Sequence, residues 1–273
     1  MPAPAMEDDD DIPWPLVTVT RYGSLRRVRF AGTEATLHAI APKVASARYL
    51  RRCFLRDIVA MRRGTSCLAS TMGMFEFGEG AQTLLCVITE NLEAGTMRDV
   101  LDDRRDLPNV ERSVLALGAA SSVCALHSAG LLHRCVRSSS FIVTARGGVK
   151  LLAPELSRRT QCHRRCGRPA VPAAAYTSPQ LLDNVFMRYR LADEVYSFGV
   201  VLWEIITGLD PFSGLSSEEI AVAATQGFRD PLHSNNAALV SVIDACRAFA
   251  PSKRPSMREA VDALRLACYA VCV

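Results

Sequence analysis

The chain has 273 residues, of which 49% are hydrophobic and 22% charged, with a formal net charge of +4 at pH 7. This composition favours a soluble globular protein and excludes a low-complexity chain, a disulfide-built secreted scaffold and a transmembrane protein. The cations are almost all arginines dispersed among acidic residues, which indicates genome composition rather than a nucleic-acid-binding surface. The ten cysteines are scattered, and the first residues resemble no signal peptide, so we expect reduced thiols in a cytosolic compartment.

The first part of the chain is predicted to form mainly strands. Residues 1–13 are acidic and contain prolines, and we predict a disordered leader there. From 14 to 40, alternating apolar and polar residues predict a meander of three strands. Residues 48–63 carry apolar side chains at helical spacing and predict a helix, and two further strands are expected at 71–78 and 83–89.

After these strands the pattern becomes helical. A polar run containing a glycine at 91–96 predicts a hinge. Helices are expected at 97–104, at 110–128, where small residues allow close packing, and at 194–204, which is apolar enough to be buried. A short hairpin ending in a strand at 149–152 separates the second of these helices from the third.

The order of these elements predicts the architecture. Residues 158–175 are rich in arginine, proline and alanine, lack periodicity and are predicted to form a mobile loop. Two or three more helices are expected near the C-terminus. Strands followed by helices predict a bilobal α+β fold within one domain at 14–270, with a β-rich N-lobe at 14–90 and a helical C-lobe at 97–270.

Several stretches of the chain resemble the protein kinase family. They include YSFGVVLWEIITGLDPF from Tyr196, CRAFAPSKRP from Cys246, and a segment from Leu131 to Glu155 with the layout of a kinase catalytic loop. GTMRDVLDDRRDL, VRSSSFIVT, VKLLAPEL and YTSPQLLDNVF are similar to the pseudokinase domain of the mixed lineage kinase domain-like family. Because the chain begins almost at this domain, without room for that family's membrane-permeabilising helical bundle, we expect it to be most similar to the truncated poxviral homologues.

The resemblance implies a phosphotransfer site whose reactive positions hold the wrong residues. These positions are His38 for the strand lysine, Asp57 for its helical glutamate partner, Cys135 for the catalytic aspartate, Ser140 for the metal-binding asparagine and Ala153 for the aspartate of Asp-Phe-Gly. Phosphoryl transfer depends on neutralised phosphate charge and on a metal held by carboxylate or amide oxygens. We therefore expect a catalytically degenerate kinase fold, which is not an enzyme and has neither a cofactor nor a metal.

The frame around these positions is expected to remain intact, with two alternatives left open. His38 and Asp57 are more readily a packed structural pair than a switch. Thr89 stands at the gatekeeper position, where a small residue leaves the adenine pocket open, so nucleotide binding without catalysis is an alternative. Arg254 meets Gln180 where kinases place a glutamate, and a hydrogen bond is expected to replace the ion pair.

The predicted loop bears on regulation. In the family that the chain resembles, an upstream receptor-interacting kinase phosphorylates a Thr-Ser pair that follows a Lys-Thr-Gln-like run. This chain has RTQ at 159–161, but Cys162 and His163 follow, and neither accepts phosphate from such a kinase, so the switch is missing. Thr160 is then more readily an unmodified loop residue than an acceptor. Cys166 adds a third possible zinc ligand, but without a fourth we attribute the cluster to chance.

A docking surface is expected where the segment 181–189 follows a Ser-Pro-Gln corner. Phe186 and Tyr189, three residues apart and beside Arg188, have the composition of an interface anchor. The resemblance implies that Phe186 contacts the upstream kinase. The alternative is that Phe186 packs into the C-lobe.

Together these features imply a kinase-fold decoy. We expect it to bind and sequester the host receptor-interacting serine/threonine kinase of necroptosis in the host cytoplasm, and so to block activation of the cellular mixed lineage kinase domain-like protein and inhibit necroptosis. We expect a monomer that neither binds nucleic acid nor inserts into membranes. The alternatives are a scaffold that binds the cellular relative or its chaperones, and a nucleotide-sensing pseudokinase.

Overall fold

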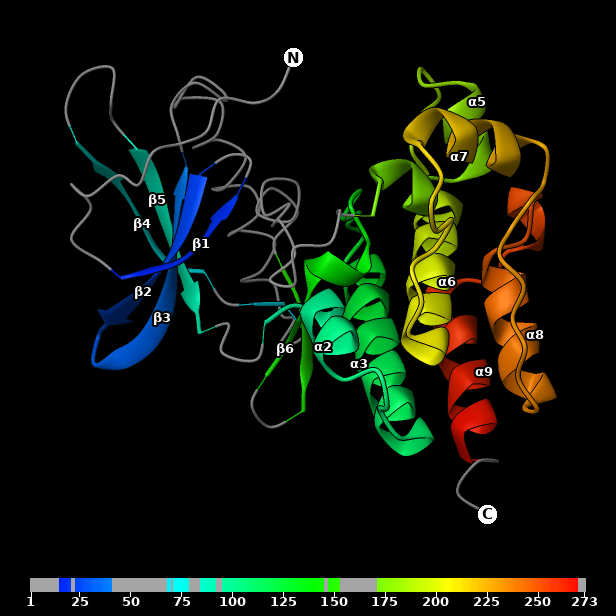
Figure 1. Ribbon diagram of the computed structural model, residues 1–273, viewed down its shortest axis with the longest axis horizontal. Helices are drawn as coiled ribbons and strands as arrows, with labels where there is room; N and C mark the ends of the chain where they lie inside the picture. The colour runs from blue at the N-terminus through cyan, green and yellow to red at the C-terminus, as the bar shows by residue number, and fades with distance from the viewer. Residues whose placement is uncertain are drawn as a thin grey trace.

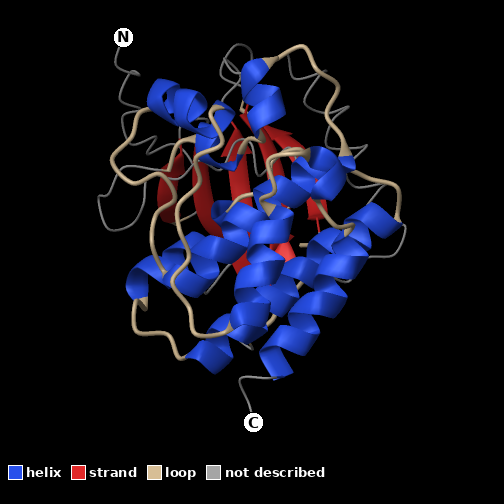
Figure 2. Cartoon of the chain, turned by 90° about the vertical axis from the view of Figure 1, so that its right-hand side faces the viewer, coloured by secondary structure: helices blue, strands red, loops and turns tan. Residues whose placement is uncertain are grey.

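A computed structural model of the chain describes residues 15–20, 23–40, 68–69, 71–78, 84–91, 95–144, 147–152 and 171–269. Figure 1 shows a twisted antiparallel sheet at one end of the molecule and a group of helices at the other. Viewed from the helical end, the helices lie in front of the sheet (Figure 2). The described residues therefore form the bilobal α+β arrangement that the element order predicts.

The N-lobe sheet has five strands in the order β1-β2-β3-β5-β4. They are β1 (Leu16–Thr20), β2 (Gly23–Phe30), β3 (Thr33–Ile40), β4 (Thr71–Phe77) and β5 (Leu84–Glu90). Each lies within a few residues of the position that alternation predicts, because apolar residues spaced two apart cover one face of a strand. The predicted helix at 48–63 and residues 92–94 of the hinge lie outside the described residues.

The hairpin between β2 and β3 sets the register of the central strand. Ala31 and Gly32 both have positive φ angles, 49° and 80°, which match the two-residue turns that join tightly paired strands. Phe30 then pairs with Thr33, and the ladder continues to the pair of Gly23 and Ile40. This register places His38 in the buried part of β3, next to β5.

The C-lobe contains seven α-helices within the described residues. They are α2 (Met97–Asp103), α3 (Asn109–Ser128), α5 (Pro179–Asp183), α6 (Leu191–Thr207), α7 (Ser217–Thr225), α8 (Ala237–Cys246) and α9 (Met257–Tyr269). Shorter pieces are the hairpin of β6 (Phe141–Val143) and β7 (Val149–Leu151), and the 3₁₀ turns η3 (Ser138–Ser140), η4 (Ala173–Tyr176) and η5 (Pro251–Lys253). None of the described helices is long and apolar enough to cross a membrane.

The core of the C-lobe surrounds α6. Residues 193–205 of this helix are buried all round, because α3 and α8 pack against it and η4 covers its start. Glycines allow the closest approaches. A Cβ on Gly118 of α3 would lie 2.8 Å from the Cβ of Val149, and one on Gly199 of α6 would lie 2.8 Å from the Cβ of Cys246. The prediction of close packing around 117–120 is thus confirmed at Gly118.

One predicted loop is partly wrong. The sequence analysis predicts a mobile loop at 158–175, but its last residues enter η4, where Ala175 is buried. The Ser197 hydroxyl of α6 donates a 2.6 Å hydrogen bond to the carbonyl of Tyr176, which fixes this turn against the core. A single 3₁₀ turn is too short to produce periodicity in the sequence. Residues 158–170 lie outside the described part of the chain.

Candidate functional site

The segment that resembles a catalytic loop is held in place by one buried carboxylate. Glu194 of α6 accepts hydrogen bonds from the backbone N–H groups of His133 (3.0 Å) and Arg134 (2.7 Å), and lies 3.1 Å from His127 Nε2. Burial alone would raise the pKa of Glu194, but these hydrogen bonds hold it below its usual value. On the other side of the loop, His133 Nε2 donates a 2.8 Å hydrogen bond to the carbonyl of Leu152. Glu194 and the carbonyl of Leu152 therefore anchor the backbone of the kinase-like loop and the ring of His133.

Two reactive positions lie on this loop and have structural contacts. Ser140, at the metal-binding position, is buried, and its hydroxyl donates a 2.6 Å hydrogen bond to the carbonyl of Cys135. Cys135, at the position of the catalytic base, is half-buried and forms no disulfide. Within the described ranges no group of three or more His, Cys, Asp or Glu residues could hold a metal ion. Ala153 and the cluster of Cys162, His163 and Cys166 lie outside those ranges.

The position of the phosphate-gripping lysine has no positive charge. His38 on β3 is buried, and its Nε2 forms a 3.0 Å hydrogen bond with Oγ1 of Thr89 on β5. Burial lowers the pKa of His38 to about 3, so the imidazole is neutral at physiological pH. Asp57, its expected partner, lies outside the described residues. Thr89 is fully buried, and its hydroxyl forms this hydrogen bond with His38, while its role beside an adenine pocket stays a prediction.

An ion pair joins the two lobes beside the hinge, and the sequence analysis missed it. Lys150 on β7 contacts Glu90 at the end of β5. Nearby, the N–H of Ala69 donates a 2.9 Å hydrogen bond to the carbonyl of Leu151. One signal was present: an acidic residue ends the strand before the hinge, and a rare lysine lies in the first C-lobe hairpin.

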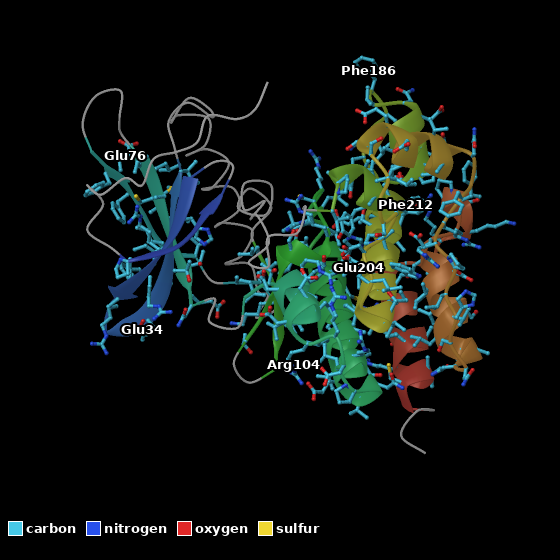
Figure 3. All side chains as sticks on the ribbon, in the orientation of Figure 1. Glu34, Glu76, Arg104, Phe186, Glu204 and Phe212 are labelled. Carbon is cyan, nitrogen blue, oxygen red and sulfur yellow. The ribbon has the colours of Figure 1, made fainter. Side chains whose placement is uncertain are left out.

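A second buried cluster of charged residues contacts the end of the catalytic-loop segment through Ser138. Arg98 of α2 forms 3.0 Å ion pairs with Glu204 of α6 and with Asp102. The hydroxyl of Ser138, at the start of η3, also donates to Glu204, at 3.0 Å. Burial raises the pKa of Glu204 to about 7, although Arg98 and the hydrogen bonds oppose this shift. Figure 3 shows Glu204 in the interior of the C-lobe, so we assign the cluster a structural role.

The expected docking residue is fully presented to solvent. Phe186 lies between α5 and α6 with 95% of its surface exposed, and its ring points away from the C-lobe (Figure 3). The turn is fixed, because the side-chain oxygen of Asn184 accepts a 3.0 Å hydrogen bond from the N–H of Phe186. The alternative that Phe186 packs into the C-lobe is therefore wrong, while its role as a partner contact stays a prediction. Arg188 is also exposed.

Tyr189, the third residue of the expected anchor, lies differently. It is only partly exposed, and its hydroxyl lies near Glu194 of α6. Burial raises the pKa of Tyr189 well above its usual value. The side chain thus fastens the 184–190 segment to α6. The accessible part of the expected anchor is Phe186 with Arg188.

The predicted replacement of a kinase ion pair is confirmed. Arg254 Nη2 donates a 2.7 Å hydrogen bond to Oε1 of Gln180, and Gln180 Nε2 in turn donates to the carbonyl of Phe249 at 2.8 Å. Arg254 Nη1 also lies 3.6 Å from the carboxylate of Asp193, and the guanidinium stacks over the ring of Tyr196 at 5.0 Å. The corner keeps its connection to α6 without the glutamate.

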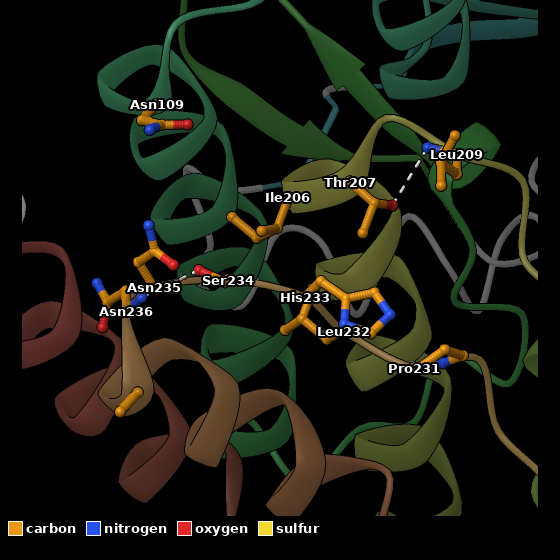
Figure 4. Close-up of a pocket in the computed structure, with 11 residues that line it drawn as sticks. Asn109, Ile206, Thr207, Leu209, Pro231, Leu232, His233, Ser234, Asn235 and Asn236 are labelled. Carbon is orange, nitrogen blue, oxygen red and sulfur yellow. Dashed lines mark hydrogen bonds between the residues drawn. The ribbon is translucent and has the colours of Figure 1, made fainter.

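A cavity of about 810 Å³ lies away from all these positions. Figure 4 shows it between the start of α3, the end of α6 and the segment 231–237. His233 is the one ionisable side chain among its lining residues. Two polar contacts in the wall are internal, from the N–H of Leu209 to Thr207 Oγ1 and from the N–H of Asn236 to Ser234 Oγ, each at 3.2 Å. This lining supplies no group of residues for catalysis.

Comparison with known proteins agrees with the fold and the loop geometry. A family model described as protein tyrosine and serine/threonine kinase matches residues 31–264, and the chain therefore belongs to this family. It is 34% identical over 271 residues to the human mixed lineage kinase domain-like protein, covering 92% of this chain and 56% of the relative. The mouse protein of that name is 32% identical over 261 residues, covering 90% and 54%. A probable serine/threonine-protein kinase of Dictyostelium discoideum is 33% identical over 187 residues, covering 66% and 20%.

These relatives confirm the coarse part of the resemblance. The chain is a kinase domain similar to that of the mixed lineage kinase domain-like proteins, and it spans about half the length of those two relatives. The similarity to truncated poxviral homologues and the domain limits at 14 and 270 stay predictions.

Proposed function

We propose that the protein is a pseudokinase that binds the receptor-interacting serine/threonine kinase of necroptosis and sequesters it. The exposed ring of Phe186 carries the proposal. It is 95% exposed on a turn whose backbone is held by Asn184, so an aromatic side chain is available to enter a partner's pocket. The similarity to the human mixed lineage kinase domain-like protein supports the choice of partner.

The proposal also holds that the protein transfers no phosphate. A neutral, buried His38 cannot neutralise phosphate charge, and the Ser140 hydroxyl is committed to the Cys135 carbonyl. Cys135 is a poor substitute for the aspartate that orients a hydroxyl nucleophile. Each change alone is expected to slow phosphoryl transfer greatly, and their combination leaves binding as the activity.

A bound kinase would also find no phosphoacceptor pair at the expected positions of this chain. Cys162 and His163 stand where the expected phosphoacceptor pair would be, and neither side chain has the hydroxyl group that a serine/threonine kinase phosphorylates. This protein would therefore occupy the kinase without being phosphorylated at these positions. Occupancy would block phosphorylation of the cellular mixed lineage kinase domain-like protein and inhibit necroptosis. A viral origin and a location in the host cytoplasm belong to the same proposal.

Co-precipitation from necroptosis-competent cells tests the partner. Tagged wild-type protein should capture the receptor-interacting kinase, and Phe186→Ala should lose at least about tenfold of that signal, as expected for a central aromatic anchor. Leu266→Ala is the matched control, because Leu266 is 74% exposed but lies on α9, at the far end of the C-lobe.

The same experiment separates the alternatives. Capture of the cellular mixed lineage kinase domain-like protein without the kinase would favour the scaffold and contradict the decoy. Capture of the kinase to the same extent by wild type and Phe186→Ala would contradict the proposed docking surface.

A further inference from the structure

A second surface of the C-lobe has the features of a binding pocket. A cavity of about 380 Å³ lies between the start of α5, the end of α7, the end of α8 and η5. Its lining includes Arg229, Arg247 and Lys253, together with the rings of Phe228 and Phe249. Neither the degenerate catalytic loop nor the Phe186 turn contributes a residue to it.

The lining carries an excess of positive charge. Its three cations face one carboxylate, that of Asp244, which leaves two formal positive charges in excess. Asp244 is shared, because its Oδ1 lies 3.0 Å from Arg247 Nη2 and 3.8 Å from Arg229 Nη1. The carboxylate of nearby Asp230 accepts a 2.8 Å hydrogen bond from a backbone N–H elsewhere and does not line the cavity.

Arg247 is the most unusual member of this group. It is only 4% exposed, and its Nε has no hydrogen-bond partner among the described residues. Its remaining nitrogens donate to the Asp230 carbonyl and to Asp244, both at 3.0 Å. A buried guanidinium with one shared carboxylate is poorly compensated, so an anion placed above it would be stabilised.

Two aromatic residues line the cavity beside the cations. Phe228 and Phe249 are 49% and 52% exposed, which is high for phenylalanine in a folded domain. Phe228 stacks at an angle of 59° on the buried ring of Phe212, with ring centroids 5.9 Å apart. The backbone carbonyl of Phe249 accepts hydrogen bonds from Gln180 and Arg254. The Phe228 ring, which packs on Phe212, therefore loses little entropy on binding.

We propose that this cavity is a docking pocket for an acidic segment of a partner protein. A carboxylate side chain of the segment meets Arg229 and Lys253, and a neighbouring apolar side chain lies against Phe228 and Phe249. Charge complementarity selects the carboxylate, and the rings select a peptide over a small inorganic anion, because only the peptide supplies an apolar group next to the charge. The pocket goes beyond the proposed function and does not depend on Phe186.

Isothermal titration calorimetry tests this with an unlabelled hexapeptide of alternating glutamate and phenylalanine. The wild-type protein should bind it, and more weakly at high salt. The variant Arg229→Glu with Lys253→Glu should weaken binding by at least about tenfold. The matched control Arg258→Glu, an exposed charge reversal on α9, should change binding by less than about twofold. Phe186→Ala should bind as the wild type does, which separates this pocket from the proposed kinase contact.

Several outcomes would overturn the pocket. Equal binding of a hexapeptide with glutamine in place of glutamate would contradict the role of charge. Competition by inorganic phosphate or inositol hexakisphosphate at the peptide's own affinity would contradict peptide selectivity. No heat of binding with wild-type protein, or equal loss in the Arg258→Glu control, would also contradict it. Equal melting temperatures of the variants would show that both charge reversals leave the fold intact.

Discussion

The chemistry of single residues explains why a kinase frame persists here around changed reactive positions. Glu194 holds the catalytic-loop backbone through the N–H groups of His133 and Arg134, and these contacts use no side chain of the reactive positions. Ser140 closes the same loop with its hydroxyl. The backbone of the loop is therefore held by hydrogen bonds that do not use the Cys135 side chain.

The pH dependence of stability tests the state of His38. The pKa of His38 in the folded protein is about 3, below the ordinary 6.5. Between these two pH values the imidazole is protonated in the unfolded chain and neutral in the folded protein. Stability is complete above about pH 6.5 and falls as the pH drops below that value. Wild type should lose about 2 kcal/mol more unfolding free energy than His38→Gln between about pH 7.5 and about pH 5. Urea unfolding measures this, and parallel pH profiles would contradict a neutral, buried imidazole.

Residue identities at these positions are readable from the sequence, but their partners are not. The motif spacing assigns His38, Cys135 and Ser140 to their expected positions, and those assignments stay predictions. The hydrogen bond between His38 and Thr89 depends on the β3–β5 register, which joins residues 51 apart. Likewise, Tyr189 has the composition of an anchor, but only the tertiary structure shows that its side chain is half-buried.

At the scale of elements, hydrogen bonds of one side chain join α5 to the segment that follows α8. Gln180 links α5 both to Arg254 and to the backbone of Phe249. Gln180→Ala removes both bonds and should lower the unfolding free energy by about 1–2 kcal/mol, since one of them involves a charged guanidinium. Chemical denaturation measures the loss. Gln226→Ala, at the exposed end of α7, is the control and should change stability by less than about 0.5 kcal/mol.

The contact between α6 and α8 depends on the absence of a side chain at Gly199. A Cβ there would lie 2.8 Å from both Cys246 Cβ and Arg247 Cγ, and 3.1 Å from the backbone nitrogen of Arg247. Gly199→Ala should destabilise the protein by about 1–2 kcal/mol, because overpacking outweighs the helix-propensity gain of alanine. Ser241→Ala is the control, because it raises helix propensity at an exposed position of α8 without creating a steric clash. A Gly199→Ala variant as stable as wild type would show that the two helices separate easily.

Long and periodic elements are predictable from the sequence, and short ones are not. The sheet strands and the helices α3 and α6 follow from apolar residues spaced at two or at three to four positions. The turn η4 has no such pattern, because contacts with α6 form it. The exposure of Phe186 could not be decided from the sequence either, since composition alone does not distinguish a surface anchor from a core residue.

The whole molecule joins two lobes, and the residue expected to stand for the phosphate-gripping lysine, His38, carries no charge. Lys150 and Glu90 connect the lobes beside the hinge, and His38 stands neutral in the N-lobe. A ligand at one hundred times its dissociation constant stabilises a protein by about 2.7 kcal/mol, which raises the melting temperature by several degrees. ATP with Mg²⁺ should instead raise it by less than about 1 °C. Differential scanning fluorimetry measures this, and a larger, concentration-dependent shift would support the nucleotide-sensing alternative.

Sequestration is the central claim, and phosphorylation of a competing substrate tests it most directly. Purified receptor-interacting kinase would be given the human mixed lineage kinase domain-like protein together with increasing amounts of this protein. We expect substrate phosphorylation to fall with wild type and with Leu266→Ala, and to continue unchanged with Phe186→Ala. Phosphorylation that proceeds at full rate in excess wild-type protein would contradict the account.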